Sequence, residues 1–185
     1  MQRTIIETAE LSGLPLAEIK SWLGISQPGD DAMLISLLAT SLASCESFIG
    51  RAPLLQTVEE RVPASPGRIR IGERPVQSLI SVEFVAEDGT RSPAEASDFS
   101  LEIDAEGVAT LLLHRQEAAP TIAVRVAAGM ADEWAKMPAQ LKQGIIRLTA
   151  HLFRDRDRSA SSAARATPPA SVLALWRPWR DVRLK

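Results

Sequence analysis

The chain has 185 residues, which is enough for one domain with a hydrophobic core, or for a compact domain that carries an insertion and a tail. With 45% hydrophobic residues, 24% charged residues and a net charge of −2, its composition is ordinary for a soluble globular protein. These values exclude a chain that is strongly basic or strongly acidic as a whole.

The small net charge hides an uneven distribution along the chain. From Ala150 to Lys185 there are eight Lys or Arg against three Asp, which gives +5, and the other 149 residues carry 13 Lys or Arg against 20 acids, which gives −7. A basic tail on an acidic body indicates an acidic partner for the tail, either a protein or a nucleic acid.

The single cysteine and the apolar segments bear on the compartment. Cys45 can form no internal disulfide, so we expect a reducing compartment and a buried thiol. Residues 1–8 lack the apolar core of a signal peptide, so we expect no export by that route. Segment 32–50 contains only one charge, Glu46, but five hydroxyl residues interrupt it, so we do not interpret it as a membrane span.

Three segments have the apolar spacing of α-helices. Residues 14–24 and 31–50 each end at a glycine, and Asp30 or Asp31 can cap the second of them. The segment 138–158 begins with a proline, which suits a first helical position, and it has an apolar stripe formed by Leu141, Ile145, Leu148 and Leu152.

Two of these helices have a second face that is a candidate subunit interface. In segment 31–50 that face has small, uncharged side chains where a solvated helix normally shows charges: Ser36, Thr40, Ala43 and Ser47. Small side chains let another backbone approach, either a second helix or a neighbouring subunit; the alternative is a central helix buried within one monomer. In segment 138–158 the polar, partly basic face includes Gln143, Arg147 and Arg154.

From Leu54 to Gly129 the apolar period changes from helical to alternating, which is typical of β-strands. Six strand candidates are bounded by turn residues: 57–62, 68–71, 78–86, 98–103, 108–114 and 122–127. Asp88-Gly89 and Glu106-Gly107 are tight-turn signals between strands. We therefore expect a small antiparallel sheet or sandwich inserted into a helical frame.

The last part of the chain changes character twice. Residues 159–169 are rich in Ser and Ala and end in two prolines, so we expect a flexible spacer. Apolar residues then return, interleaved with arginines: Val172, Leu175, Trp176, Arg177, Pro178, Trp179, Arg180 and Arg183. Trp and Arg are enriched at binding hot spots, so this segment is either a docking arm for a partner or a strap over its own core.

The sequence shows none of the arrangements that catalysis or metal binding normally needs. His114 and His151 have no second ligand at metal-binding spacing, and there is no phosphate loop or nucleophile elbow. Adjacent acids such as Glu59-Glu60 point apart on a strand, and we interpret them as solvated surface. We therefore expect a protein that is not an enzyme and that has no cofactor and no metal.

The order of several short segments along the chain is also informative. They are residues 30–31, residues 48–51, Arg74-Pro75-Val76, residues 124–129, Met137-Pro138, residues 141–143, residues 150–153, Pro168-Pro169 and residues 172–180. In this order and spacing the chain, from about Leu14 to Leu184, resembles the head–tail connector (adaptor) proteins of tailed bacteriophages. Related adaptors occur in phage-like gene transfer agents.

The resemblance implies a ring of about a dozen copies between the portal and the first tail component. It implies a homo-oligomer whose partners are a portal protein, a tail-side connector or terminator protein, and double-stranded DNA that passes through the centre without sequence-specific binding; no membrane is involved. In related adaptors the C-terminal segment engages the portal, and here that segment corresponds to Val172 to Arg183. The expected location is the bacterial cytoplasm during assembly and then the head–tail junction of a virion or gene-transfer-agent particle.

The predicted fold class is α+β: a helical frame of three main helices, an inserted antiparallel β-sheet or sandwich, and an extended C-terminal arm. The expected parts are N-terminal helices, a β region, a long helix, and a spacer with the arm, at residues 1–53, 54–130, 131–158 and 159–185. Two other interpretations stay open. One is a DNA-associated phage accessory protein that uses its basic C-terminal tail, and the other is a small hydrolase or transferase with an unrecognised site.

Overall fold

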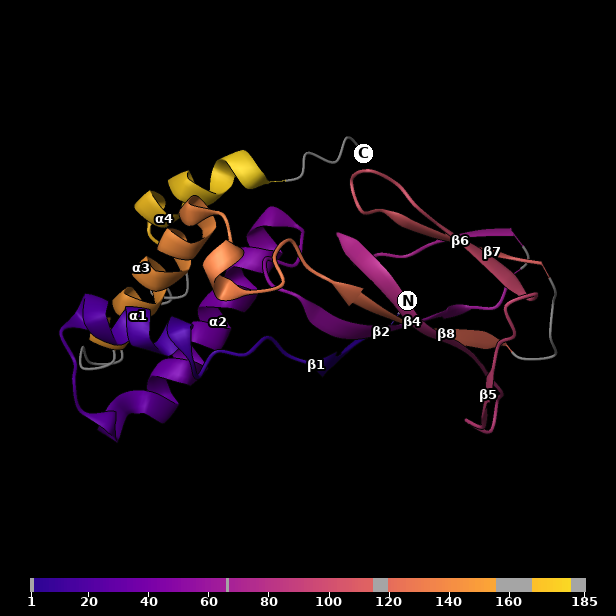
Figure 1. Cartoon of the computed structure of the whole chain (residues 1–185), viewed down its shortest axis with the longest axis horizontal. Helices are drawn as coiled ribbons and strands as arrows, with labels where there is room; N and C mark the ends of the chain where they lie inside the picture. The colour runs from indigo at the N-terminus through magenta and orange to yellow at the C-terminus, as the bar shows by residue number, and fades with distance from the viewer. Residues whose placement is uncertain (1, 66, 115–119, 156–167, 181–185) are drawn as a thin grey trace. The chain divides into compact units, whose positions relative to one another are not determined.

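The structure, a computed structural model, describes these residues of the chain: 2–65, 67–114, 120–155 and 168–180. The chain divides into two compact units, drawn in Figure 1. We call them the sheet unit, formed by Met1–Ala9 and Leu54–Met130, and the helical unit, formed by Glu10–Pro53 and Ala131–Lys185. The fold class is α+β, as predicted.

The described residues of the sheet unit form two antiparallel sheets. The five-stranded sheet has the order β1-β2-β8-β4-β5, with strands at Gln2–Glu7, Gln56–Pro63, Thr121–Ala128, Val76–Val85 and Arg91–Pro93. The three-stranded sheet has the order β3-β7-β6, with strands at Gly67–Arg70, Ala109–Leu113 and Phe99–Ile103. All six strand candidates are present, and each ends within two residues of its predicted position.

Strands β1 and β5 were not predicted. Residues 2–7, which we placed with the N-terminal helices, instead form the edge strand β1 and pair with β2. All six residues of β1 are exposed, and Ile5 and Ile6 are adjacent, so the strand has no alternating apolar pattern from which it could be recognised. At the other edge, β5 has only three residues, which is too short to show a period.

Alternate side chains of the two sheets form the core of the sheet unit. Val82 of β4 is paired with Val124 of β8, and both belong to one buried cluster with Leu111 of β7. Because side chains of a strand alternate between faces, Glu83 and Arg125 lie on the opposite face of the five-stranded sheet. That face is polar, and it is described with the candidate sites below.

Both predicted tight turns are present. Asp88-Gly89 lies between β4 and β5, and Glu106-Gly107 lies between β6 and β7. Both glycines have a left-handed backbone, with φ of 86° at Gly89 and 75° at Gly107. Their surroundings differ: a Cβ at Gly107 would overlap Pro75, whereas nothing lies within 4 Å of a Cβ at Gly89.

We expect Gly107→Ala to lower the free energy of unfolding of the sheet unit by about 3 kcal/mol, of which about 1 comes from the left-handed backbone and the rest from overlap with Pro75. Gly89→Ala, the matched control, has only the backbone cost of about 1 kcal/mol. Urea unfolding followed by far-UV circular dichroism measures both. All four tryptophans lie in the helical unit, so their fluorescence follows that unit separately. Equal losses in the two variants would contradict the contact with Pro75.

The described residues of the helical unit contain four α-helices: α1 (Leu14–Leu23), α2 (Asp31–Ile49), α3 (Ala139–Asp155) and α4 (Ala170–Trp176). Single 3-10 turns are η1 (Pro28–Asp30), η2 (Trp134–Lys136) and η4 (Arg177–Trp179). Helix α3 contacts each of the other three α-helices described. The three predicted helices are confirmed over the described residues, and α4 is an addition in the segment that we expected to be extended. Asp30 precedes α2, but its side chain makes no capping hydrogen bond.

Helices α2 and α3 pack together and include a polar contact within the buried interface. The Thr149 hydroxyl oxygen lies 2.9 Å from the Ser41 hydroxyl oxygen and 2.9 Å from the Ile145 carbonyl oxygen, so both buried hydroxyls have a partner.

Cys45 of α2 is fully buried, as predicted, and burial raises the pKa of its thiol. By length and hydropathy Pro28–Ile49 could cross a membrane, a weak criterion that core helices of soluble proteins also meet.

Candidate functional site

The C-terminal segment is held on the helical unit by Trp176. Its side chain is fully buried, and its indole nitrogen donates a hydrogen bond to the Leu141 carbonyl oxygen at 3.3 Å. The indole fills the space where Gly144 has no side chain, because a Cβ at that position would overlap the indole ring. Trp176 also packs on Phe48 of α2, with ring centroids 6.1 Å apart and the two ring planes tilted.

The rest of the described arm is partly exposed. Val172 is buried with Trp176, whereas Arg177, Pro178 and Arg180 are exposed and Leu175 and Trp179 are half-buried. The Trp179 indole nitrogen donates to the Gln140 side chain at 2.8 Å, and the Arg180 guanidinium lies 5.5 Å from the centre of the Phe48 ring. Residues 168–180 therefore cover their own helical unit. Arg183 and residues 159–167 of the predicted spacer lie outside the described residues, whereas its last two residues, Pro168 and Pro169, are described.

The two candidate interface faces have different exposure. On α2, the four small residues Ser36, Thr40, Ala43 and Ser47 are all exposed, so this side of α2 is not a buried face within one monomer. On α3, Arg147 and Arg154 are exposed and Gln143 is half-buried. The opposite side of α2 faces the core, with Leu34, Leu38, Ser41, Cys45 and Ile49 buried.

An open groove of about 700 Å³ runs between the small face of α2 and the start of the arm. Its lining residues are Thr40, Ala43, Ser44, Ser47, Phe48, Pro168 and Leu173. Thr40 donates its hydroxyl proton to the Ser36 carbonyl oxygen at 2.9 Å, and Ser44 donates to the Thr40 carbonyl oxygen at 2.8 Å. These two hydroxyl protons are used within α2, so the groove presents mainly methyl, methylene and ring surfaces.

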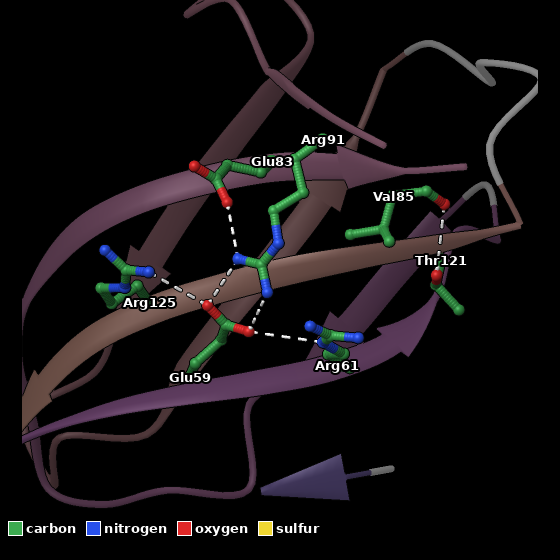
Figure 2. Close-up of polar contacts among 7 residues, drawn as sticks. All are labelled: Glu59, Arg61, Glu83, Val85, Arg91, Thr121 and Arg125. Atoms are coloured by element: carbon green, nitrogen blue, oxygen red, sulfur yellow. Dashed lines mark hydrogen bonds and ion pairs between the residues drawn. The ribbon is translucent and has the colours of Figure 1, made fainter. Parts of the chain in front are cut away.

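The polar face of the sheet unit is organised around Glu59, which is only 4% exposed. Figure 2 shows Arg91 between Glu59 and Glu83; the Arg91 guanidinium donates two hydrogen bonds of 2.8 Å to Glu59 and one of 2.9 Å to Glu83. Arg125 and Arg61 donate to the same Glu59 carboxylate at 3.2 Å and 3.3 Å. Hydrogen bonds from Arg91 are the main reason that the pKa of Glu59 is lowered to about 2.

The interpretation of Glu59-Glu60 as solvated surface was wrong. The two side chains do point apart, as expected on a strand, but both are buried because each has partners distant in sequence. The Glu60 carboxylate accepts hydrogen bonds from the backbone N–H groups of Gly72 at 3.0 Å and Glu73 at 2.6 Å. Burial raises the pKa of Glu60. Glu59 stays ionised near neutral pH and its lone pairs are occupied by arginines, so it is poorly suited to acid or base catalysis.

The residues in the described ranges include no group of three or more His, Cys, Asp or Glu that could hold a metal ion. His114 is exposed at the end of β7, and His151 on α3 lies 3.9 Å from Asp155. Around one groove the structure brings together Thr40, Ala43 and Ser47 of the predicted α2 face with Pro168 and Leu173 of the arm. Among the described residues, none of the predicted portal-contact side chains lines this groove, and neither does Ser36. The structure does not bring the polar residues Arg147 and Arg154 into that groove.

Comparisons with known proteins give structural matches only. No family model and no curated protein matches the chain. A chain in the neck of an empty gene transfer agent (GTA) particle, computed with C6 symmetry, matches with a TM-score of 0.79 and 21% identity. A chain in the neck of the native GTA particle, computed with C12 symmetry, has a TM-score of 0.76 and 22% identity. A chain in the virion of the native GTA particle matches with a TM-score of 0.75 and 21% identity. Each of the three matches covers 100% of this chain and 98% of the matched chain, so the whole fold is shared.

We expect Gly144→Ala to displace the arm, because the added methyl group overlaps the buried Trp176 indole. The loss in free energy of unfolding of the helical unit should be about 2 kcal/mol, a typical cost of overpacking. Gly29→Ala is the control, since nothing lies within 4 Å of a Cβ there, and it should change stability by less than about 0.5 kcal/mol. Urea unfolding followed by tryptophan fluorescence compares them, and equal stability of the two variants would rule out the contact.

We expect Glu59→Gln to destabilise the sheet unit by about 3 kcal/mol at neutral pH, because it leaves three arginines without their shared carboxylate. The folded pKa of Glu59 is about 2 and its ordinary value is 4.5, so its contribution is present above pH 4.5 and is lost as pH falls towards 2. The difference between wild type and variant should shrink in that window, as measured by urea unfolding at several pH values. Glu83→Gln, which removes the charge of one half-buried partner of Arg91, should cost less than about 1 kcal/mol.

Proposed function

We propose that this chain is a non-enzymatic head–tail adaptor of a phage or gene-transfer-agent particle. About a dozen copies form a ring between the portal and the tail, and double-stranded DNA passes through the centre of the ring. The observation that supports this most directly is the full-length likeness to chains in GTA necks, at TM-scores of 0.79 and 0.76. Because both units of the chain are matched, the likeness is not confined to one common module.

The exposed side of the arm is the proposed portal contact. Trp176 and Val172 hold the arm on the helical unit, and the proposed contact therefore falls on the exposed or half-buried residues Leu175, Arg177, Pro178, Trp179 and Arg180. Arg183, which lies outside the described residues, belongs to the same proposal. A dozen weak contacts that act together gain strongly from effective concentration, so each arm needs only modest affinity.

The remaining partners follow from the same proposal. The small face of α2 and the polar face of α3 are the proposed contacts between subunits: Ser36, Thr40, Ala43, Ser47, Gln143, Arg147 and Arg154. A tail-side connector or terminator protein would bind the ring on the side away from the portal. The net charge of −2 suits a ring that lets DNA pass without holding it tightly. The proposed location is the bacterial cytoplasm during assembly and then the head–tail junction.

We expect the double variant Arg177→Glu/Arg180→Glu to weaken binding to the matching portal by about tenfold or more, since both guanidinium groups are exposed on the arm. Binding is measured by sedimentation of the full-length chain with the portal. The control, Arg68→Glu/Arg70→Glu, makes the same charge change on exposed residues of β3 and should bind as wild type.

The same experiment separates the proposal from its alternative. If the two double variants bind the portal equally, the arm is not the portal contact. If wild type does not bind the portal but binds double-stranded DNA with steep salt dependence, the chain is a DNA-associated accessory protein instead.

A further inference from the structure

We propose that the groove between α2 and α4 receives Trp22 from the next copy of this chain, in a head-to-tail contact. This inference rests on the proposed ring and assigns the two surfaces that close it. One surface is the groove lined by Thr40, Ala43, Ser44, Ser47, Phe48, Pro168 and Leu173. The other is the indole of Trp22 in the last turn of α1.

The chemistry of the groove favours an apolar, uncharged occupant. None of the lining residues within the described ranges carries a charge. Two of its hydroxyl groups donate to carbonyl oxygens of their own helix, so a polar ligand would find few free donors. Phe48, Pro168 and Leu173 supply ring and branched surfaces, and Ala43 leaves space for a large side chain. A volume of about 700 Å³ can accommodate an indole together with neighbouring atoms of its helix.

Trp22 is a suitable occupant because its side chain is large and apolar and because ion pairs hold its helix, α1, in position. Its side chain is 47% exposed, although Trp is a residue type that is mostly buried on average. Helix α1 is capped by Gly24, two residues later, so Trp22 lies in the last turn of the helix. Two ion pairs hold α1 in place: Lys20 with Asp31 at 2.5 Å, and Glu18 with Lys142 at 3.5 Å. Insertion therefore requires little ordering of the helix, which lowers the entropy cost of binding.

Cyclic symmetry favours a second copy over other occupants. A closed ring needs a head-to-tail contact, in which two different surfaces of the same chain meet across each interface. The groove lies on α2 and α4, and Trp22 lies on α1, so one copy carries two different surfaces on different helices, as a head-to-tail contact requires. An isologous contact, in which each copy offers the same patch, would give a dimer and leave the ring open.

The test uses four single variants of the full-length chain, assembled with the matching portal and measured by native mass spectrometry. Trp22→Ala removes the indole, and Ala43→Glu places a charge in the groove; each should reduce ring assembly by about tenfold or more. The matched controls are Leu14→Ala, which truncates another exposed apolar residue of α1, and Ala39→Glu, which adds the same charge to an exposed residue of α2 outside the groove. Both controls should assemble as wild type.

Mixing the two disruptive variants tests the direction of the contact. A Trp22→Ala chain keeps its groove and an Ala43→Glu chain keeps its indole, so a concentrated mixture should give pairs with one copy of each, and neither variant alone should pair. Absence of mixed pairs, or loss of assembly in Ala43→Glu but not in Trp22→Ala, would overturn the assignment of Trp22. Normal rings in all four variants would overturn this inference alone. Failure of wild type to form a ring would contradict the proposed function and this inference with it.

Discussion

The packing of Trp176 against Gly144 determines which surfaces of the helical unit are available to partners. The buried indole bonds the Leu141 carbonyl group and packs on Phe48, so α4 is fixed across α3 and next to α2. This position brings Pro168 and Leu173 to the edge of α2, where they complete the groove. It also leaves Arg177, Pro178 and Arg180 on the outside. One aromatic contact therefore creates a groove and an exposed basic segment in the same unit.

The strands of the sheet unit are joined in a different way, by hydrogen bonds to the buried carboxylate of Glu59. Glu59 is surrounded by three arginines from β2, β5 and β8, which joins strands that are distant in sequence on the polar face of the sheet. The other face packs apolar side chains into the core. A hydrogen-bonded network of this kind makes the sheet unit rigid. Because the Glu59 carboxylate already accepts hydrogen bonds from three arginines, it is poorly suited to proton transfer.

Much of this fold could be predicted from the sequence, because its signals are local. Alternating residues located β2 and β8, Asp88-Gly89 located a hairpin turn, and apolar spacing located α1, α2 and α3. What could not be predicted depends on residues far apart in the chain. Glu59 looked like surface because Arg91 and Arg125, its partners, lie 32 and 66 residues away. Similarly, nothing in the local sequence of Gly144 indicates that an indole 32 positions later fills its place.

The proposed function requires that copies of this chain form a closed ring on a portal. Electron microscopy of the wild-type chain bound to its matching portal tests it most directly, because class averages along the ring axis reveal rotational symmetry. We expect a ring of about a dozen copies around an open channel, with each helical unit in contact with the next. Single copies scattered on the portal, or no density beyond the portal itself, would contradict it.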